Sequence, residues 1–203
     1  MRELIVVRHA EAGANVADCV SGEPPGPGLT QRGREQAAAL RSRLADVRLE
    51  LGIATELLRT QQTLAQALAG RDVPTIVEPA FNEVRFGTFE GGPLAAYRHW
   101  AWTEPPDVHP PGGGESRAEV AARVAAGLER LLARAEDVVL LVGHALPLRY
   151  VLDAADGVFP AARVEHLGHA VVGPRLDASA VATAARTLRS WSRSPRFRDA
   201  PRL

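Results

Sequence analysis

Two histidines occupy equivalent positions in the sequence, each just after an apolar run. His9 follows the run at residues 4–7, and His144 follows the strongest run, at 138–142. Short β-branched runs of this kind predict buried strands of a parallel sheet. Ligands of such sheets bind beyond the carboxyl ends of the strands, so the two imidazoles are expected to meet at one site. For either histidine alone, a loop or core position is the simpler interpretation.

Two arginines accompany these histidines. Arg8 precedes His9, and Arg59 falls in the first turn of a helix predicted to begin at Thr55. The amides and the dipole of a helix N-terminus favour an anion, and a guanidinium fork matches the oxygens of a phosphate. A single arginine is usually a solvated surface charge, but two arginines and two histidines together favour a phosphate site.

The composition narrows the chemistry further. The chain has 203 residues, 46% of them hydrophobic, as expected for one globular domain. Its formal net charge is zero, which gives no global electrostatic reason to bind nucleic acid or an anionic membrane. All 24 basic residues are arginines, so a Schiff-base lysine and a Walker-type phosphate lysine are excluded. The single Cys19 excludes a disulfide within the chain and counts against a cysteine zinc site.

The elements that position these residues are predicted to alternate. Strands are expected at 4–7, 53–54, 75–78 and 138–142, and helices at 30–45, 55–69 and 116–135. Thr30 and Thr55 are the expected N-caps of the first two helices, and Ser116 with Glu119 forms a capping box for the third. Irregular segments rich in glycine or proline are expected at 10–28 and 79–115. The alternation predicts an α/β fold, a three-layer α/β/α sandwich with a mostly parallel central sheet.

The chain is expected to form one α/β domain at 1–187, followed by an Arg/Pro-rich surface tail at 188–203. A basic contact arm is the less favoured interpretation of that tail. No apolar run approaches the ~20 residues of a membrane helix, and no signal-peptide pattern is visible at the start, so we expect a cytoplasmic location. Whether the chain forms a homodimer is left open.

A series of motifs adds a family resemblance. Arg8-His9-Ala10-Glu11, followed by Asn15, resembles the R-H-G signature of the histidine phosphatase superfamily, which includes cofactor-dependent phosphoglycerate mutases. Its other motifs are matched in order by Ser21-Gly22, Gly28-Leu-Thr-x-x-Gly33-x-x-Gln36-Ala37, Thr55-x-x-x-Arg59-Thr-x-Gln-Thr63, Glu83-x-x-Phe-Gly-x-x-Glu90-Gly91, Gly113-Gly-Glu-Ser116 and Val142-Gly-His144. The resemblance extends from residue 4 to about residue 152, and the rest of the chain matches loosely.

The resemblance implies a role for each matched residue. His9 is the expected nucleophile, which forms a phosphohistidine, and Glu83 is the general acid for the leaving oxygen and then the base that activates water. Phosphate binding is assigned to Arg8, Arg59, His144, Asn15 and the amide of Ala145, and substrate binding to Ser21 and Gly22. No metal and no cofactor is expected, and the partner is a small phosphorylated metabolite. Such chemistry needs a neutral His9 and a protonated Glu83, so their pKa values are predicted to be lowered and raised respectively.

Two positions depart from the family pattern. The glycine that usually follows the first histidine is Ala10 here, which costs free energy if the site needs a positive φ or close contact with the phosphate. The residues after His144 are Ala-Leu-Pro instead of a glycine-rich turn, and Pro147 removes one amide. Neither change removes a catalytic group, so activity is expected, with an unusual substrate left open.

Hydrolysis is favoured over two alternatives. The mutases that resemble this signature carry a longer insertion after the glutamate and commonly a lysine there, whereas only residues 92–113 separate Gly91 from Gly114, and the chain has no lysine. We therefore predict a metal-independent phosphatase that acts on a small-molecule phosphomonoester. The alternatives are a cofactor-dependent phosphoglycerate-type mutase and a non-catalytic phospholigand-binding protein. The sequence does not name the leaving group.

The segment from Tyr97 to Trp102 has two interpretations. Its aromatic residues form part of a lid and pack on a ring-shaped leaving group, or Trp100 and Trp102 anchor an irregular loop to the core. The remaining histidines show no convincing arrangement of metal ligands: His99, His109, His166 and His169.

Overall fold

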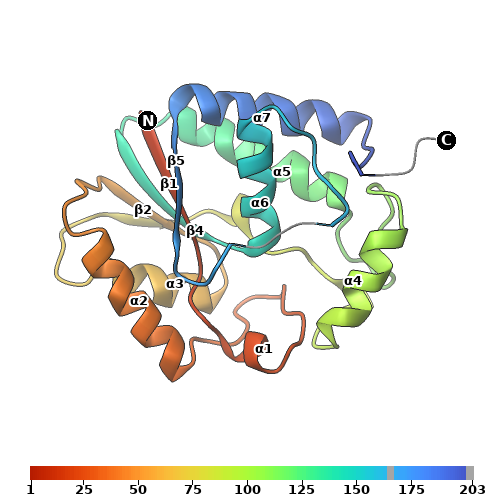
Figure 1. The fold of residues 1–203 in the computed structure, drawn as a ribbon, viewed down its shortest axis with the longest axis horizontal. Coiled ribbons are helices and arrows are strands. Elements are labelled where there is room, and N and C mark those ends of the chain that lie inside the picture. Colours follow the sequence, from red (N-terminus) through yellow and green to blue (C-terminus); the bar gives the residue numbers. More distant parts are fainter. Residues whose placement is uncertain (164–166, 200–203) are drawn as a thin grey trace.

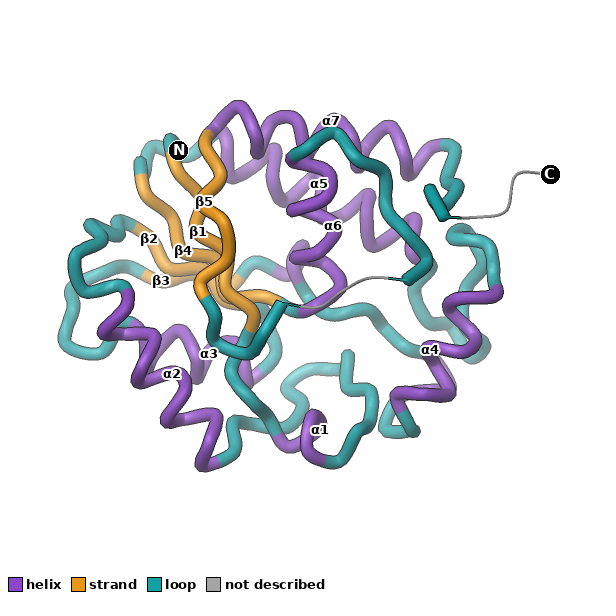
Figure 2. Tube along the Cα trace, in the orientation of Figure 1, coloured by secondary structure: helices purple, strands orange, loops and turns teal. Residues whose placement is uncertain are grey.

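A five-stranded sheet forms the centre of the molecule. The structure, a computed structural model, describes residues 1–163 and 167–199. The strands are β1 (Glu3–Arg8), β2 (Leu51–Ala54), β3 (Thr75–Val77), β4 (Val138–Gly143) and β5 (Val172–Asp177), in the order β3-β2-β4-β1-β5 (Figures 1 and 2). The first four run parallel, and β5 is antiparallel to β1. The predicted mostly parallel sheet is therefore confirmed.

Helices cover both faces of the sheet and complete the three predicted layers. One face carries α2 (Gln31–Arg43) and α3 (Leu58–Ala67), and the other carries α5 (Arg117–Leu132), α6 (Ala145–Ala155) and α7 (Ala178–Arg193) (Figure 1). The short α1 (Gly13–Val16) and α4 (Leu94–Thr103) lie outside these layers, beyond the carboxyl end of β1. Two 3-10 turns, Pro79–Phe81 and Gly87–Phe89, lie in the connection from β3 to α4.

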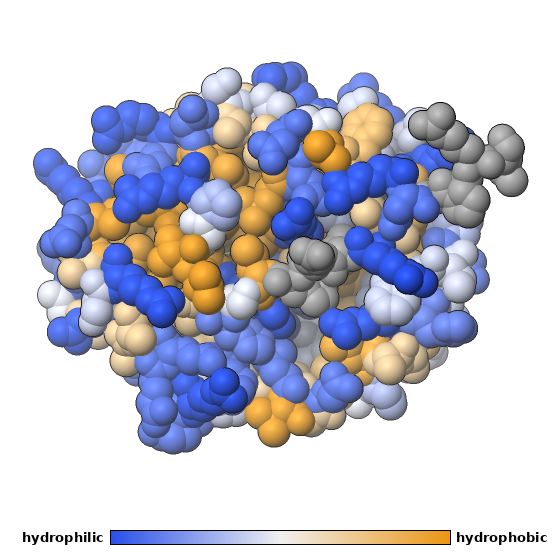
Figure 3. Space-filling view, viewed as in Figure 1, coloured by the Kyte–Doolittle hydropathy of each residue, from blue (hydrophilic) through white to orange (hydrophobic). Residues whose placement is uncertain are grey.

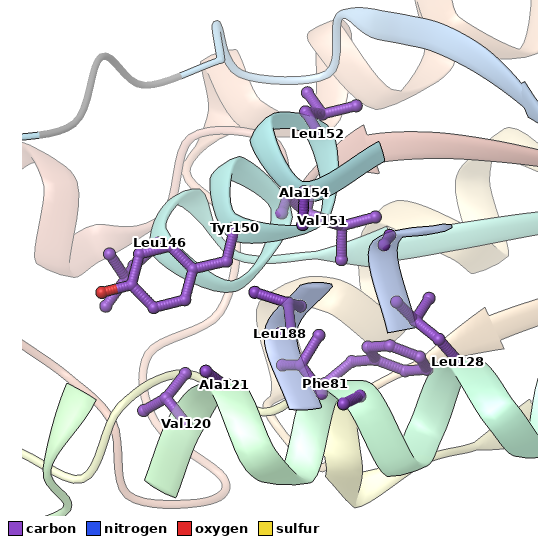
Figure 4. Close-up of a cluster of buried hydrophobic side chains, with 14 of the residues drawn as sticks. Phe81, Val120, Ala121, Leu128, Leu146, Tyr150, Val151, Leu152, Ala154 and Leu188 are labelled. Atoms are coloured by element: carbon purple, nitrogen blue, oxygen red, sulfur yellow. The ribbon is translucent and has the colours of Figure 1, made fainter. Parts of the chain in front are cut away.

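The two faces of the sheet explain why its strands are apolar throughout. Successive side chains of a strand point to opposite faces. Leu4 and Val6 accordingly belong to the cluster shared with α5, α6 and α7, while Ile5 and Val7 pack with α2 and α3. Figure 4 shows part of the larger cluster, where Phe81, Leu128 and Leu188 gather from separate elements. Both faces of β1 are thus packed, which fixes the position of His9 directly after the strand.

Two of the three predicted helix caps are confirmed. Thr30 Oγ1 accepts from Gly33 N at 2.9 Å, and Ser116 N donates to the Glu119 carboxylate at 2.9 Å. The predicted Thr55 cap is wrong, because α3 begins at Leu58 and its N-cap is Leu57. The Thr55 hydroxyl instead lies 2.9 Å from the Thr60 hydroxyl and 2.9 Å from His144 Nε2.

The C-terminal part of the chain differs from the predicted surface tail. The boundary at residue 187 falls inside α7, which runs to Arg193. Leu188 and Trp191 are buried, and Trp191 contacts the rings of Tyr150 and Phe197. The apolar residues of α7 recur at helical spacing, so Arg189 and Arg193 lie on the less buried side of a packed helix, and Arg196 and Arg198 follow its end. Arg202 lies outside the described residues.

The segment 79–115 was expected to be irregular and contains α4. Its flanking prolines and glycines are real breaks, but residues 94–103 between them form a helix. On the outside, hydrophilic side chains cover most of the face shown in Figure 3 and interrupt its apolar patches. Within the described ranges, none of the helices combines the length and apolar character needed to cross a bilayer.

Candidate active site

The register of β1 and β4 brings the two histidines together. Arg8 pairs with Gly143, so the next residues, His9 and His144, leave the sheet side by side. His9 N donates to Gly143 O at 3.0 Å, and the two ring centroids are 5.3 Å apart. The prediction that the two imidazoles come together is therefore confirmed, although His9 lines the cavity and His144 does not.

Arg59 links the two rings. Its Nε donates to His9 Nε2 at 3.1 Å, and its Nη2 lies 3.2 Å from His144 Nδ1. The same Nη2 donates to Ser21 O at 2.8 Å. The side chain is buried, yet Nη1 has no hydrogen-bond partner among the residues that the structure describes. A buried guanidinium nitrogen without a partner is a strong site for an anion.

The hydrogen bonds of His9 select its reactive nitrogen. Nδ1 lies 2.8 Å from Ala10 O, so this nitrogen carries the proton and donates it to the carbonyl. Nε2 then holds the lone pair and accepts from Arg59. Burial and the neighbouring Arg59 charge lower the pKa of His9 well below 6.5, so the ring is neutral at neutral pH. Nε2 is the candidate nucleophile.

His144 is fully buried behind this group. Its Nε2 lies 2.9 Å from Thr55 Oγ1, and burial together with Arg59 lowers its pKa well below 6.5. A second threonine of the same motif, Thr63, accepts from Ala10 N at 3.0 Å and donates to Arg59 O at 2.7 Å. The threonines of the Arg59 motif therefore hold the two histidine-bearing strand ends in place.

Arg8 and Glu83 complete the ionisable groups. Arg8 Nη1 donates to Leu167 O at 2.9 Å, and its Nε is buried without a partner within the described parts of the chain. Glu83 is half-buried, and its Oε1 accepts from Val84 N at 3.0 Å. Burial raises the pKa of Glu83 despite the opposing charges of Arg59 and Arg8. The predicted directions for His9 and Glu83 both agree with the structure.

The two departures from the family pattern cause no visible strain. Ala10 is fully buried, its φ is outside the positive region, and its methyl group packs with Leu29, Ala37 and Ala170. Pro147 stands in the first turn of α6, where a backbone N–H has no partner within the helix. Alanine and proline therefore fit these positions.

Three of the four remaining predicted site residues line the central cavity, and Gly22 does not. Asn15 lines the central cavity, and its Oδ1 accepts from Ala12 N at 2.9 Å. Ala145, the first residue of α6, and Ser21 line it as well. Gly22 N donates instead to both carboxylate oxygens of Glu90, at 3.0 and 2.9 Å. A side chain at Gly22 would lie 2.0 Å from Val84 O, so the close approach explains the glycine and the amide is already occupied.

The cavity has a volume of about 310 Å³ and two contrasting walls. The cationic wall comprises Arg8, His9, Asn15, Arg59 and Ala145, and the aromatic wall comprises Phe86, Leu94, Tyr97, Arg98 and Trp102. Glu83 also lines the cavity. One side therefore suits a phosphate and the other an organic group.

The two tryptophans of α4 have different surroundings, and the anchoring interpretation applies to Trp100. Trp100 is partly buried and contacts the rings of Phe89 and Tyr97, at centroid distances of 5.7 and 5.8 Å, so it anchors α4. Trp102 is 42% exposed and lines the cavity, with the Arg163 guanidinium 4.9 Å above its ring.

His169 is a neighbour of His9 that the sequence did not reveal. Their ring centroids are 5.8 Å apart, and Ala170 N donates to Arg8 O at 3.0 Å. Burial lowers the pKa of His169 to about 4. The pairing of β5 with β1 brings this residue to the site, and no local motif predicts that pairing. His166 lies outside the described residues.

The arrangement defines a class of protein. A neutral imidazole with an in-line lone pair, a guanidinium with an open nitrogen and a carboxyl group of raised pKa are the parts that transfer a phosphoryl group through histidine. No group of three or more His, Cys, Asp or Glu residues in the described ranges is placed to hold a metal ion. The model of the histidine phosphatase superfamily (branch 1) matches residues 4–172, and the chain belongs to this family.

Relatives in the family have different activities. An adenosylcobalamin/α-ribazole phosphatase of Salmonella typhimurium is 41% identical over 87 residues, which is 43% of either chain. A 2,3-bisphosphoglycerate-dependent phosphoglycerate mutase of Brucella anthropi is 31% identical over 175 residues, 78% of this chain and 84% of the mutase. The matched segment thus spans less than half of the phosphatase and most of the mutase.

Solved structures are similar over most of the chain. A structure described as a putative α-ribazole-5'-P phosphatase from Escherichia coli is 27% identical, with a TM-score of 0.76, over 87% of this chain and 90% of that one. Mycobacterial glucosyl-3-phosphoglycerate phosphatase in complex with VO3 is 26% identical, with a TM-score of 0.71, over 84% of this chain and 88% of that one.

Proposed function

We propose that this chain is a metal-independent phosphatase that hydrolyses a small-molecule phosphomonoester through a phosphohistidine on His9. The observation that carries the proposal is the geometry of one nitrogen. His9 Nε2 holds a lone pair because Nδ1 donates to Ala10 O, and it lies against Arg59, whose Nη1 is free for an anion. Arginine supplies the positive charge that stabilises the transferring phosphoryl group.

The first step forms a nitrogen–phosphorus bond and breaks the ester bond. The His9 Nε2 lone pair, which gives up its hydrogen bond with Arg59 Nε, attacks the phosphorus in line, and the protonated Glu83 carboxyl donates its proton to the leaving oxygen. Arg8, Arg59, Asn15 and the amide of Ala145 hold the equatorial oxygens. The cationic wall is ordered before substrate binds, because its groups are fixed by Leu167, Ser21 and Ala12. Such preorganisation lowers the barrier without reorganisation during the reaction.

The second step returns the enzyme to its starting state. The Glu83 carboxylate takes a proton from water, the water oxygen attacks the phosphorus, and the bond to His9 breaks. Glu83 ends protonated and His9 neutral, so the cycle closes with one water consumed. A raised Glu83 pKa serves both steps, because the group must hold a proton in one and take a proton in the other.

The aromatic wall supports a leaving group with an apolar or ring-shaped part. Phe86, Tyr97 and Trp102 supply flat apolar surface to the lining of the cavity. The names of two relatives describe an adenosylcobalamin/α-ribazole phosphatase and a glucosyl-3-phosphoglycerate phosphatase, which are enzymes of phosphorylated metabolites. We propose the same class of partner here, with a cytoplasmic location and no nucleic-acid partner.

Hydrolysis of an aryl phosphate in EDTA tests the proposal. We expect turnover that survives chelation and disappears in His9→Ala, while His99→Ala, which removes an exposed histidine of α4, retains it. Turnover that requires added metal, or that persists in His9→Ala, would contradict the proposal. Isomerisation of a phosphoglycerate primed by a bisphosphorylated compound, with negligible hydrolysis, would favour the mutase, as the longer match to the Brucella enzyme allows.

A further inference from the structure

Helix α4 carries two cavity-lining residues, Tyr97 and Arg98, whose polar groups have no partner among the described residues. Tyr97 is 6% exposed, and its hydroxyl is buried without a hydrogen-bond partner among the described residues. Arg98 is half-buried and lines the same cavity, with no hydrogen bond or ion pair to any residue that the structure describes. A buried hydroxyl without a partner is costly unless a ligand satisfies it, and Arg98 offers a cation that no protein group already pairs.

The phosphoryl group does not account for these two residues. Its oxygens are served by the cationic wall, whose open donors are Arg8 Nε and Arg59 Nη1. Tyr97 and Arg98 belong to the aromatic wall, where the leaving group lies. Tyr97 and Glu83, the proposed proton donor to the leaving oxygen, line the same cavity. Burial raises the pKa of Tyr97, so the hydroxyl remains a donor.

The charges that line the cavity also indicate a second anionic group. Its lining includes four arginines, Arg8, Arg59, Arg98 and Arg117, and Glu83 is the one acidic side chain among the described lining residues. Arg117 is occupied, because it donates to the Tyr150 hydroxyl and to Ala161 O and stacks on Phe197. Arg98 remains, and its charge lies close enough to Arg8 to lower the pKa of that guanidinium. A single phosphate leaves this excess of positive charge uncompensated.

We propose that Tyr97 and Arg98 form a subsite for a second anionic group, a carboxylate or a phosphate, carried by the leaving group of the substrate. The proposal rests on the proposed phosphatase function and narrows its substrate class to anionic phosphomonoesters. The guanidinium of Arg98 pairs with the anion, and the Tyr97 hydroxyl donates a hydrogen bond to it. The flat rings around them, Phe86 and Trp102, hold the carbon skeleton between the two anionic ends.

Matched aryl phosphates test the subsite. 3-Carboxyphenyl phosphate and 3-carbamoylphenyl phosphate have nearly the same size and differ by one negative charge, and 3-phosphonophenyl phosphate distinguishes a phosphate-like group from a carboxylate. The 4-substituted isomers test a longer distance between the phosphate and the second anionic group. The wild-type enzyme should prefer at least one anionic substrate over its carbamoyl counterpart by roughly 10-fold in kcat/KM, the value of one charge-assisted hydrogen bond.

Variants assign that preference to α4. Arg98→Gln should reduce the ratio of anionic to carbamoyl kcat/KM to near one, Arg98→Lys should retain part of it, and Tyr97→Phe should lower it several-fold. The control Arg163→Gln removes an exposed cation stacked on Trp102 outside the cavity lining, and should leave the ratio unchanged. Thermal unfolding checks that each variant is folded.

Three results would overturn the subsite. The first is equal wild-type kcat/KM for anionic and carbamoyl substrates in both the 3- and the 4-substituted series. The second is an anionic-to-carbamoyl ratio that stays unchanged in Arg98→Gln, and the third is a fall of that ratio in Arg163→Gln as large as in Arg98→Gln, which would indicate long-range attraction. Failure of the phosphatase proposal is distinct, because the wild-type enzyme would then hydrolyse none of the aryl phosphates, and the subsite would fall with it.

Discussion

The cationic and aromatic walls of the cavity are built from different kinds of structure. The cationic wall stands on strand ends and first helical turns, and its side chains are fixed by hydrogen bonds to backbone, such as Arg59 Nη2 to Ser21 O. The aromatic wall stands on α4, outside the three layers, and includes groups without partners, such as the Tyr97 hydroxyl. The difference is that most phosphate-binding groups of the proposed mechanism stand on elements fixed by the sheet, whereas most of the proposed leaving-group site stands on a helix outside the three layers.

The largest effect is expected from Glu83→Gln. Loss of the proton donor should slow hydrolysis of an alkyl phosphate by about 10²- to 10⁴-fold, the usual contribution of general acid catalysis. An aryl phosphate with a nitrophenyl leaving group needs little protonation, so its cleavage step should slow much less. The measurement is single-turnover release of each leaving group, with Glu129→Gln as the control because the exposed Glu129 pairs with Arg189 and does not line the cavity. Equal losses for both substrates would remove Glu83 from the role of acid.

The pH dependence of the activity follows from His9 and Glu83. His9 must be neutral, so activity is lost as the pH falls through its pKa, which burial and Arg59 hold well below 6.5. Glu83 must be protonated in the first step, so activity is also lost as the pH rises through its pKa, which burial raises above 4.5. The kcat/KM profile should be bell-shaped with its maximum on the acidic side. Glu83→Gln should remove the alkaline limb and retain the acidic one.

Arg59→Lys is the next test of the cationic wall. Lysine keeps the charge but has one nitrogen, so it cannot contact His9, His144 and Ser21 at once. We expect kcat to fall about 10²- to 10³-fold, as for loss of a preorganised transition-state donor. Arg71→Lys, which affects an arginine that donates to Leu44 O and Val47 O away from the cavity, is the control. A loss confined to KM would mean that Arg59 serves binding alone.

The aromatic wall should respond differently at its two tryptophans. Trp102→Ala removes a cavity-lining ring and should lower kcat/KM for a ring-bearing substrate by about 3- to 10-fold, with stability nearly unchanged. Trp100→Ala removes a packed ring and should reduce the free energy of unfolding by about 2 kcal/mol. Chemical denaturation and steady-state kinetics on both variants separate the two roles, and a reversed pattern would contradict the assignment.

The smallest effect is expected at His169. Its ring contacts the His9 ring, and its charge, present at low pH, contributes to lowering the His9 pKa. His169→Ala admits water beside His9 and removes that charge, so the acidic limb of the pH profile should move to higher pH, with at most a several-fold loss of kcat. His169→Phe keeps the ring contact and should retain kcat more fully. Identical profiles for wild type and His169→Ala would exclude the contact from catalysis.

The contrast also marks what the sequence could predict. Arg8, His9 and Arg59 of the cationic wall follow from local signals, namely an apolar run followed by histidine and a predicted helix start near Arg59, whereas Asn15 and the Ala145 amide follow only from the family resemblance. The aromatic wall depends on α4, whose bounding prolines and glycines suggested an irregular segment although ten helical residues lie between them. His169 depends on the antiparallel pairing of β5 with β1, and β5 contains Gly173 and Pro174, which hide a strand that only tertiary contact stabilises.

The most direct measurement is the capture of the covalent intermediate. Glu83→Gln mixed with nitrophenyl phosphate should release a burst of nitrophenol close to one equivalent of enzyme, because the first step needs little acid while the second has lost its base. Acid-labile, alkali-stable phosphate should then be found on His9 by peptide mass spectrometry. Absence of a phosphoenzyme with steady product release, or phosphate on any residue other than His9, would contradict the account.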